Sequence, residues 1–413
     1  MADYDIVIIG GSPAGRYAAA IAAQMKATVA LVEWQQLPIA DSRLPTTDSL
    51  SYVGQLTQQC DKLGIFGLNL RCGDASQDGQ TSVEWKQIMQ WVQGVRANLE
   101  EENSPVVLAA LGVDFIQGQA KFVAQPQLGL VVNDRSLVAR NYLIATNPRP
   151  LIPDIEGLEA TKFLTASEVL PSLTAANSPR RWAILGGDPS GCQLAQTLAR
   201  LGLDVTLIVK RSQILPKEDP EAALVVQQQL ESEKIRVITA TRVERVEQID
   251  GKKHLWAGTE KIIADEILVA AGRMPNVESL NLEAAGVEVG ERGIRVNEKL
   301  QTTNPRIYAC GDVIGGYQFT HVAGYEASVV LKNALFFPVT KANYRVIPWA
   351  TFTDPELARV GLTEKQAKER YGDDRHPDLP WGYWMVSSGS VPGEPPLIDE
   401  DGREWGSVRE AFW

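Results

Sequence analysis

The chain contains 413 residues and has a mass of 45.2 kDa, a length that predicts two or three domains rather than one. Hydrophobic residues make up 44% and charged residues 22% of the sequence, a composition that excludes a disordered, collagen-like or coiled-coil chain. The net charge of -11 at pH 7 argues against nucleic acid and anionic lipid as partners, because the field of the chain repels both.

No apolar run reaches the roughly 18 residues that a membrane span requires, and the N-terminus lacks the basic region of a signal peptide. Only three histidines occur, and no pair of cysteines has Cys-x-x-Cys spacing. A zinc site, a disulfide scaffold and a His-rich metal site are therefore disfavoured, and we expect a cytoplasmic protein without a metal. The four cysteines are Cys60, Cys72, Cys192 and Cys310.

The start of the chain predicts a strand, a tight turn, a helix and a second strand. An apolar strand is expected over residues 5–9, a glycine-rich turn over 10–15, an Ala-rich helix over 16–25 and another strand over 28–32. This order is typical of a βαβ unit that binds a nucleotide at its turn.

The same order recurs in the middle of the chain. A strand is expected over residues 183–185, a turn over 186–191, a helix over 192–201 and a strand over 205–209. Two such units predict an α/β fold with two doubly wound, Rossmann-like nucleotide-binding domains.

The other segments indicate where these domains begin and end. Short strands and turns are expected over residues 106–129, and an apolar strand over 142–146. A Pro-rich link at 148–153 predicts a domain boundary. Further strands are expected over 266–271 and 307–312, and the second of these runs into a turn that carries an acid.

The first turn matches the dinucleotide-binding pattern G-x-G-x-x-G at two of its three glycines. Gly10 and Gly15 hold the first and third positions, and Ser12 replaces the second, where its Cβ crowds a phosphate but its hydroxyl can donate. Glu33 ends the following strand, where an acid can bind ribose hydroxyls. We expect a dinucleotide here; a well-packed turn without a ligand is the alternative.

The second turn departs further from the pattern. Gly186 and Gly191 are present, but Asp188 occupies the middle position and Pro189 follows it. A carboxylate about 4 Å from a pyrophosphate charge costs roughly 4 kcal/mol per pair at an effective dielectric near 20. Asp188 could instead cap the helix, and proline is compatible with a first helical position.

The strand after the second turn ends in two cations rather than an acid. Val209 is followed by Lys210 and Arg211. Two cations suit a 2′-phosphate, so NADPH is favoured over NADH as the nicotinamide. A solvated basic loop end is the alternative, and the unfavourable charge of Asp188 keeps both interpretations open.

Together with the two turns, several motifs resemble the FAD-dependent pyridine nucleotide–disulfide oxidoreductases, a family that includes dihydrolipoamide dehydrogenase, glutathione reductase and mercuric reductase. The resemblance extends over residues 4–374. In chain order the motifs are residues 152–157 (IPDIEG), 271–276 (AGRMPN), 302–312 (TTNPRIYACGD), 321–323 (HVA), 352–356 (FTDPE) and 360–363 (VGLT).

The resemblance implies that the first turn and Glu33 hold the ADP half of FAD, that Asp312 bonds the ribityl chain, and that Thr320 to Ala323 lie near the isoalloxazine ring. It implies an FAD domain (1–150 and 276–340) interrupted by an NAD(P) domain (151–275), followed by a truncated α+β dimerisation piece (341–413). The expected cofactor-binding residues are Gly10, Ser12, Pro13, Ala14, Gly15, Glu33, Thr146, Gly186, Gly191, Lys210, Arg211, Gly272, Arg273, Gly311, Asp312, Thr320, His321 and Ala323.

The catalytic parts of the family are missing from the sequence. Family reductases carry a Cys-x4-Cys disulfide followed by Ser-Lys after the ribose-binding acid. A gapless alignment from Glu33 places Asp41 and Thr46 at the cysteines, retains the serine as Ser49 and places Leu50 at the lysine. The glutamate that pairs with this lysine becomes Gln193. Because both partners of the pair are lost together, no unpaired buried charge is left.

Three further features distinguish this chain from the family. We interpret Cys60 and Cys72 as unpaired structural thiols, because they lie too far along the sequence from Glu33 to replace the cysteines of the disulfide. Trp381 stands where a His-x4-Glu pair beginning at His376 would require glutamate. The composition changes over residues 376–413, so we expect a shortened interface domain and a doubtful homodimer. We hypothesise that this segment results from a shifted reading frame or a replaced tail. The mass of the intact protein and the sequence of the coding DNA test this hypothesis.

Two functional interpretations follow. In the first, the chain is an FAD-dependent oxidoreductase that takes hydride from NAD(P)H, with NADPH favoured, and reduces an unknown non-disulfide acceptor such as a quinone, a dye, oxygen or a small electron carrier. In the second, it is a non-enzymatic FAD-binding protein that has lost turnover. The sequence identifies no catalytic residue beyond the cofactor.

Overall fold

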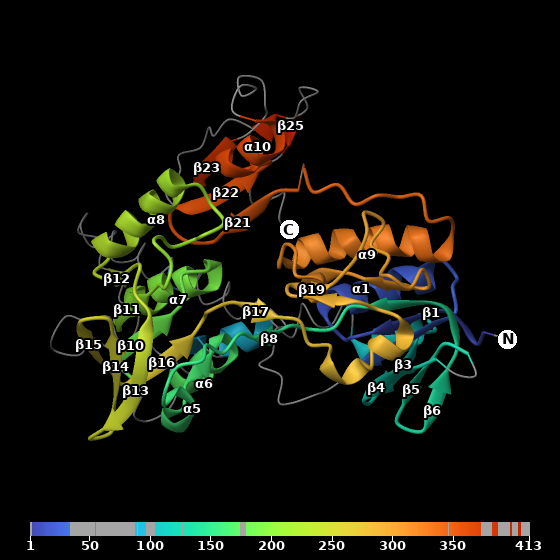
Figure 1. The fold of residues 1–413 in the computed structure, drawn as a ribbon, viewed down its shortest axis with the longest axis horizontal. Helices are drawn as coiled ribbons and strands as arrows, with labels where there is room; N and C mark the ends of the chain where they lie inside the picture. Colours follow the sequence, from blue (N-terminus) through green and yellow to red (C-terminus); the bar gives the residue numbers. More distant parts are fainter. Residues whose placement is uncertain are drawn as a thin grey trace. The chain divides into compact units, whose positions relative to one another are not determined.

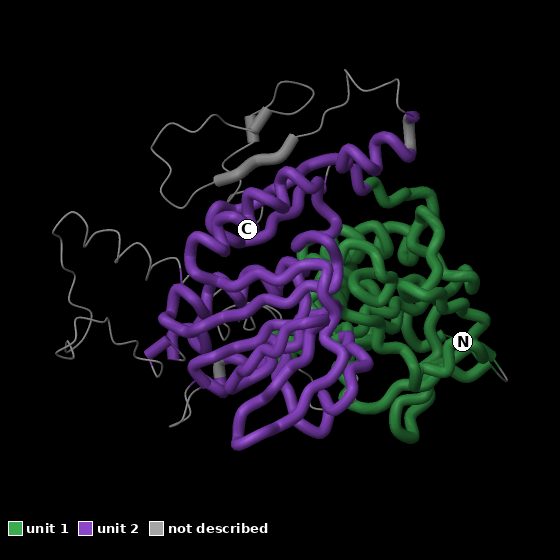
Figure 2. The backbone as a smooth tube through the Cα atoms, turned by 60° about the vertical axis from the view of Figure 1, so that its left-hand side comes forward, with its two compact units in different colours: residues 1–43, 96–150, 273–343 green, residues 44–95, 151–272, 344–413 purple. Residues whose placement is uncertain are grey.

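In the computed structural model, the described residues are 2–33, 54, 87–88, 90–95, 104–124, 127–173, 179–345, 347–372, 382–386, 397–398 and 404–405. The chain divides into two compact units (Figure 2). The first unit is formed by residues 1–43, 96–150 and 273–343, and the second by residues 44–95, 151–272 and 344–413. Each unit has its own central sheet and its own hydrophobic core.

A five-stranded parallel sheet forms the centre of the first unit, in the order β20–β7–β1–β2–β3 (Figure 1). Because the strands on either side of β1 are reached by connections in opposite directions, the turn after β1 lies at the switch point where such sheets bind ligands. The strands are β1 (Tyr4–Ile9), β2 (Val29–Glu33), β3 (Asp114–Gln117), β7 (Ala139–Ile144) and β20 (Ile307–Ala309).

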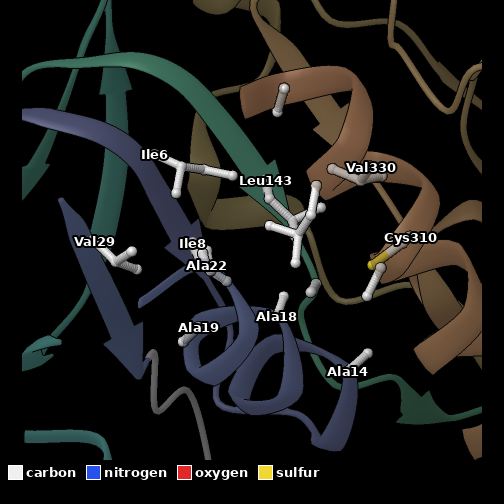
Figure 3. Packing of buried hydrophobic residues seen from close by; sticks show 14 of the residues in the cluster. Ile6, Ile8, Ala14, Ala18, Ala19, Ala22, Val29, Leu143, Cys310 and Val330 are labelled. Atoms are coloured by element: carbon white, nitrogen blue, oxygen red, sulfur yellow. The ribbon is translucent and has the colours of Figure 1, made fainter. Parts of the chain in front are cut away.

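Two helices, α1 (Pro13–Gln24) and α9 (Thr320–Leu335), cover one face of this sheet. The buried side of α1 is almost entirely alanine, and these small side chains let the helix approach both the strands and α9 closely. Figure 3 shows Ala22 of α1 next to Ile8 and Ala18 of α1 next to Leu143 of the sheet.

A second parallel sheet in the order β12–β11–β10–β16–β9 forms the centre of the second unit (Figure 1). The helices α7 (Pro189–Arg200) and α8 (Pro220–Ser232) pack their apolar sides in its core. The strands are β9 (Leu164–Thr165), β10 (Arg181–Leu185), β11 (Asp204–Ile208), β12 (Arg236–Ile238) and β16 (Glu266–Val269).

Each unit also contains a three-stranded antiparallel sheet. In the sequence, this sheet lies between the parallel strands β3 and β7 in the first unit, and between β12 and β16 in the second. This shared plan confirms the predicted α/β fold with two Rossmann-like domains. In the first unit the antiparallel strands are β4 (Ala120–Val123), β5 (Gly129–Val132) and β6 (Arg135–Leu137). In the second they are β13 (Val243–Ile249), β14 (Lys252–Ala257) and β15 (Glu260–Ala264).

The C-terminal part of the second unit contains a further antiparallel sheet of β21 (Trp349–Thr351), β22 (Glu356–Val360) and β23 (Gly382–Val386), and the helix α10 (Glu364–Tyr371). Other elements are α4 (Pro105–Ala110), α5 (Leu158–Thr161), α6 (Val169–Leu173), β8 (Arg149–Pro150), β17 (Arg273–Met274), β18 (Val289–Gly290), β19 (Gly293–Ile294), β24 (Leu397–Ile398), β25 (Glu404–Trp405) and the 3-10 helices Ala166–Glu168, Glu278–Leu280, Glu283–Ala285 and Gly311–Ile314.

Two local predictions need correction. The strands and turns expected over 106–129 overlap helix α4, which Ser104 caps through its side chain. Helices α1 and α7 each begin three residues earlier than predicted, because a proline at the first helical position belongs to the helix rather than the turn.

A buried charge network joins α7 to the C-terminal segment within the second unit. Arg200 Nη2 lies 2.7 Å from Glu233 Oε1 and 2.9 Å from Asp354 Oδ2, and its side chain is 4% exposed. The side-chain amide of Gln196 bonds both the backbone N–H and the backbone C=O of Asp354. The segment is therefore fixed to α7 by hydrogen bonds and ion pairs that are shielded from water.

We expect Arg200→Met to destabilise the second unit by about 3–5 kcal/mol, because it leaves two buried carboxylates without their cation. Arg236→Met is the matched control, since the Arg236–Glu260 pair is exposed and contributes at most about 1 kcal/mol. Thermal unfolding of both variants measures the difference. Equal losses of stability in the two variants would contradict the burial of the Arg200 network.

Candidate functional site

The first glycine-rich turn brings the end of β1 into contact with the start of α1. Gly10 has φ +119°, and a Cβ on it would overlap the carbonyl group of Ala145. A Cβ on Gly15 would overlap the carbonyl oxygen of Gly10. Only glycine fits these two positions, so the N-terminus of α1 is held at the carboxyl end of β1, where free N–H groups favour an anion.

Serine is accommodated at the second position of the pattern because it caps the helix. Ser12 is the N-cap residue of α1, and its Oγ accepts a hydrogen bond from the Gly15 N–H at 3.1 Å. Pro13 occupies the first helical position and Ala14 is buried behind it. The Ser12 side chain is thus turned back toward the helix.

Glu33 lies at the end of β2 and is 9% exposed. Its Oε1 accepts a hydrogen bond from Arg16 Nη2 at 2.6 Å, and Arg16 Nε donates to the Gly11 carbonyl at 3.2 Å. A Cβ on Gly11 would overlap the Glu33 carboxylate. Sequence reasoning missed Arg16; its signal is a single cation in an alanine-rich helix directly after the third glycine.

The predicted residues Asp312 and Arg273 meet in the first unit. Arg273 Nη1 lies 2.9 Å from Asp312 Oδ2, and Arg273 Nη2 donates to the carbonyl of Gln318 at 2.8 Å. Thr146 is buried behind the first turn and donates to the carbonyl of Asn276 at 2.9 Å. The carboxylate of Asp312 is therefore oriented by an arginine from the AGRMPN motif.

Gly311 and the first turns of α9 lie against each other. A Cβ on Gly311 would lie 3.2 Å from the Cβ of Ala323, and the Gly311 N–H donates to Glu326 Oε2 at 2.6 Å. Glu326 is fully buried and was not predicted. Thr320 is exposed, and the ring of His321 lies 5.7 Å from the ring of Phe319.

The second turn repeats the backbone of the first. Cβ atoms on Gly186 and Gly191 would overlap the carbonyl oxygens of Ala270 and Gly186 respectively. Asp188 is the N-cap residue of α7, but its side chain makes no capping hydrogen bond, so the proposed capping role is wrong. Its Oδ2 lies 3.3 Å from the position of a Cβ on Gly272.

The cations predicted to select the nicotinamide follow β11. Lys210 and Arg211 are both exposed, and within the part of the chain that the structure describes neither forms an ion pair. Val209 is 3% exposed, and a Cβ on Gly187 would contact its side chain. The second unit therefore has an apolar residue where the first has Glu33.

The structure describes two of the four cysteines. Cys192 and Cys310 are free and buried, and burial raises the pKa of each thiol, with a further increase from Asp188 for Cys192 and from Glu326 for Cys310. Gln193 is buried on α7. The sequence-based assignments at Asp41, Thr46, Ser49, Leu50, Cys60, Cys72, His376 and Trp381 lie outside the described residues.

The residues that the structure describes also bear on metal binding and membrane insertion. Among them, no group of three or more His, Cys, Asp and Glu side chains is arranged to hold a metal ion. No helix that the structure describes is long and apolar enough to cross a membrane.

We expect Cys192 and Cys310 to resist iodoacetamide in the folded protein from pH 7 to 9, because burial disfavours the reactive thiolate. In the unfolded protein their alkylation should increase as pH rises through the ordinary thiol pKa of about 8.5. Peptide mass mapping after timed alkylation measures both. Rapid labelling of either cysteine in the folded state would show that its thiol is accessible.

Comparison with known proteins extends these observations. Residues 4–327 match the family model described as pyridine nucleotide-disulphide oxidoreductase, and residues 347–380 match the dimerisation domain of that family. Mercuric reductase of Staphylococcus aureus is 34% identical over 385 residues, which cover 92% of this chain and 68% of the relative.

Two further proteins are similar over most of the chain. Dihydrolipoyl dehydrogenase of Bacillus subtilis (strain 168) is 34% identical over 379 residues, 89% of this chain and 79% of the relative. The flavoprotein disulfide reductase RclA of Escherichia coli, solved as a Cu(II) complex, has a TM-score of 0.73 at 27% identity and covers 88% of this chain and 79% of that one. The chain therefore belongs to the pyridine nucleotide-disulphide oxidoreductase family, whose members are FAD-dependent oxidoreductases with NAD(P)H as substrate.

Proposed function

We propose that this chain is an FAD-dependent oxidoreductase that takes hydride from NADPH and reduces an acceptor other than a disulfide. The observation that carries the proposal is the distribution of thiols. The sequence contains four cysteines, and no two have the Cys-x4-Cys spacing of the redox disulfide in the family. Cys192 and Cys310 are buried and free, so neither supplies an accessible thiolate.

The first turn fits the pyrophosphate of FAD. The close contact of Gly10 and Gly15 leaves room for a phosphate at the N-terminus of α1, where backbone N–H groups and the helix dipole favour negative charge. Glu33, at the end of β2, offers a carboxylate to the ribose hydroxyls of FAD. Asp312, at the start of a 3-10 helix, offers a second carboxylate to the ribityl chain. Bound FAD supplies the ring that accepts hydride and passes electrons on.

The second turn supports NADPH rather than NADH. An acid at the end of the second strand would bind the 2′-hydroxyl of NADH, but Val209 stands there and is buried. Lys210 and Arg211 follow it and are exposed to solvent. Their charges suit a 2′-phosphate, for which arginine offers a bidentate fork and lysine a point charge.

The names of the relatives point to other substrates for those proteins, namely mercuric ion, dihydrolipoyl groups and disulfides. A disulfide relay needs two cysteines beside the flavin, and the family positions align here with Asp41 and Thr46, neither of which can form a disulfide. A quinone, a dye, oxygen or a small electron carrier requires no thiol relay. We therefore assign the acceptor to this class.

The match of residues 347–380 to the dimerisation domain supports a homodimer, which the sequence alone made doubtful. The cytoplasmic location stays a prediction. A second candidate function, a flavin-binding protein without turnover, is favoured by Asp188, because its carboxylate stands at the turn that would receive the nicotinamide pyrophosphate.

Anaerobic mixing with NADPH and with NADH tests the proposal. We expect NADPH to bleach the flavin faster than NADH, and a quinone but not a disulfide to reoxidise it. Flavin that stays oxidised with both nucleotides supports the non-enzymatic alternative. A protein that cannot be loaded with FAD contradicts both functions, and rapid disulfide turnover contradicts the assigned acceptor.

We further expect Lys210→Ala and Arg211→Ala to weaken NADPH binding more than tenfold each, since a hydrogen bond to a charged group contributes about 1.5–3 kcal/mol. Binding of NADH should not change. Lys234→Ala is the matched control, because it removes an exposed cation of the same unit that lies away from the end of β11. Titration of nucleotide binding with the flavin signal measures all three variants. If NADPH and NADH affinities fall equally, the 2′-phosphate assignment is wrong.

Substitutions in the two turns should affect the two cofactors separately. Gly15→Ala and Gly191→Ala introduce the same overlap with the first glycine of their respective turns. We expect Gly15→Ala to lose FAD, and Gly191→Ala to retain FAD but to resist bleaching by NADPH. The absorbance spectrum before and after NADPH distinguishes them. If Gly191→Ala also loses its flavin, the assignment of one cofactor to each turn fails.

A further inference from the structure

The two nucleotide-binding turns correspond residue by residue. Residues 10–33 and 186–209 both run from a first glycine through a proline-started helix of 12 residues to the end of the next strand. The strand registers also agree, because Ile6 pairs with Val29 in the first unit and Trp182 pairs with Val205 in the second. Each side chain of the first turn therefore has an identifiable counterpart in the second.

The counterparts of Arg16 and Glu33 are Cys192 and Val209. Arg16 Nε donates to the Gly11 carbonyl at 3.2 Å, and Cys192 Sγ donates to the corresponding Gly187 carbonyl at 3.5 Å. Glu33 contacts Gly11 as Val209 contacts Gly187. One chain thus holds two versions of the same buried pair, one charged and one neutral.

We propose that Arg16 is a positioning residue for Glu33, holding its carboxylate in the orientation that receives the adenosine ribose of FAD. Arg16 bonds Oε1 at 2.6 Å, whereas Oε2 accepts a longer hydrogen bond of 3.5 Å from the side-chain amide of Gln117. One carboxylate oxygen is therefore fixed, and the other remains to accept hydrogen bonds from ribose hydroxyls. This inference rests on the proposed binding of FAD at the first turn.

Burial gives the physical reason for the pair. The side chains of Arg16 and Glu33 are 9% and 11% exposed, so a carboxylate at this position needs a cation before any ligand arrives. Because the guanidinium also bonds the Gly11 carbonyl, it fixes the carboxylate relative to the turn itself. A ribose then meets a preorganised acceptor, which lowers the entropy cost of binding.

The second turn supports this interpretation. There the acid and the cation are absent together, and Cys192 and Val209 fill the space with side chains that are 0% and 3% exposed. The bond between the helix and the turn carbonyl therefore forms in the second turn without arginine. In the first turn, Arg16 adds a positive charge and a second donor, Nη2, which bonds the carboxylate of Glu33.

The test measures ribose discrimination, which is the ratio of the affinities for ADP and for 2′,3′-dideoxy-ADP. A merely structural role of Arg16 would not alter this ratio. Apoprotein is titrated with FAD, and ADP and 2′,3′-dideoxy-ADP compete for the site. We expect the wild type to bind ADP more than tenfold tighter than the dideoxy analogue. This preference should fall to about twofold in Arg16→Met and in Glu33→Val, and to an intermediate value in Arg16→Lys, whose single ammonium cannot reproduce the two-donor fork.

A double variant separates stability from recognition. Arg16→Cys combined with Glu33→Val copies the second turn and leaves no unpaired buried charge, so it should unfold near the wild-type temperature yet show no ribose discrimination. Wild-type discrimination in folded Arg16→Met or folded Arg16→Lys overturns the inference. Failure of the wild type to bind FAD instead refutes the proposed function, so the two failures are distinguishable.

Discussion

Both glycine-rich turns depend on one close contact, between the carbonyl oxygen of the first glycine and the Cα of the third. A Cβ on Gly15 would overlap the Gly10 oxygen, and a Cβ on Gly191 would overlap the Gly186 oxygen. This contact fixes the first turn of a helix against the end of the central strand. The helix N-terminus then faces the crevice at the carboxyl end of the sheet, where the side chain at the end of the next strand can reach a ribose.

The two turns share this backbone but differ in charge. In the first, Ser12 caps the helix and the Arg16–Glu33 pair is internally neutral, so an anionic pyrophosphate meets no uncompensated negative charge. In the second, Asp188 stands at the N-cap position and the balancing cations lie at the end of β11, outside the turn. The same backbone therefore carries a neutral group of side chains in the first turn and separated charges in the second.

Much of this was predictable from the sequence, because glycine spacing and apolar strands are local signals. The order of strand, turn and helix followed from residues 5–33 and 183–209, with errors of three residues where each helix begins with proline. The Arg16–Glu33 pair was not predictable, because it forms only when β2 lies beside β1. The bond between Gly311 and the buried Glu326 likewise depends on how α9 packs.

The charge of Asp188 and the charges of Lys210 and Arg211 act on different properties of the second turn. Under the proposed function, a carboxylate near the pyrophosphate would repel NADH and NADPH alike, because both dinucleotides carry that group, so Asp188 would lower the affinity for both without changing the preference between them. The 2′-phosphate exists only in NADPH, so in this proposal the two cations would distinguish the nucleotides there. An exposed site is screened over a Debye length of about 8 Å at physiological ionic strength. Salt should therefore weaken the proposed preference for NADPH through the exposed cations, whereas Asp188 in the turn would limit the affinity for either nucleotide.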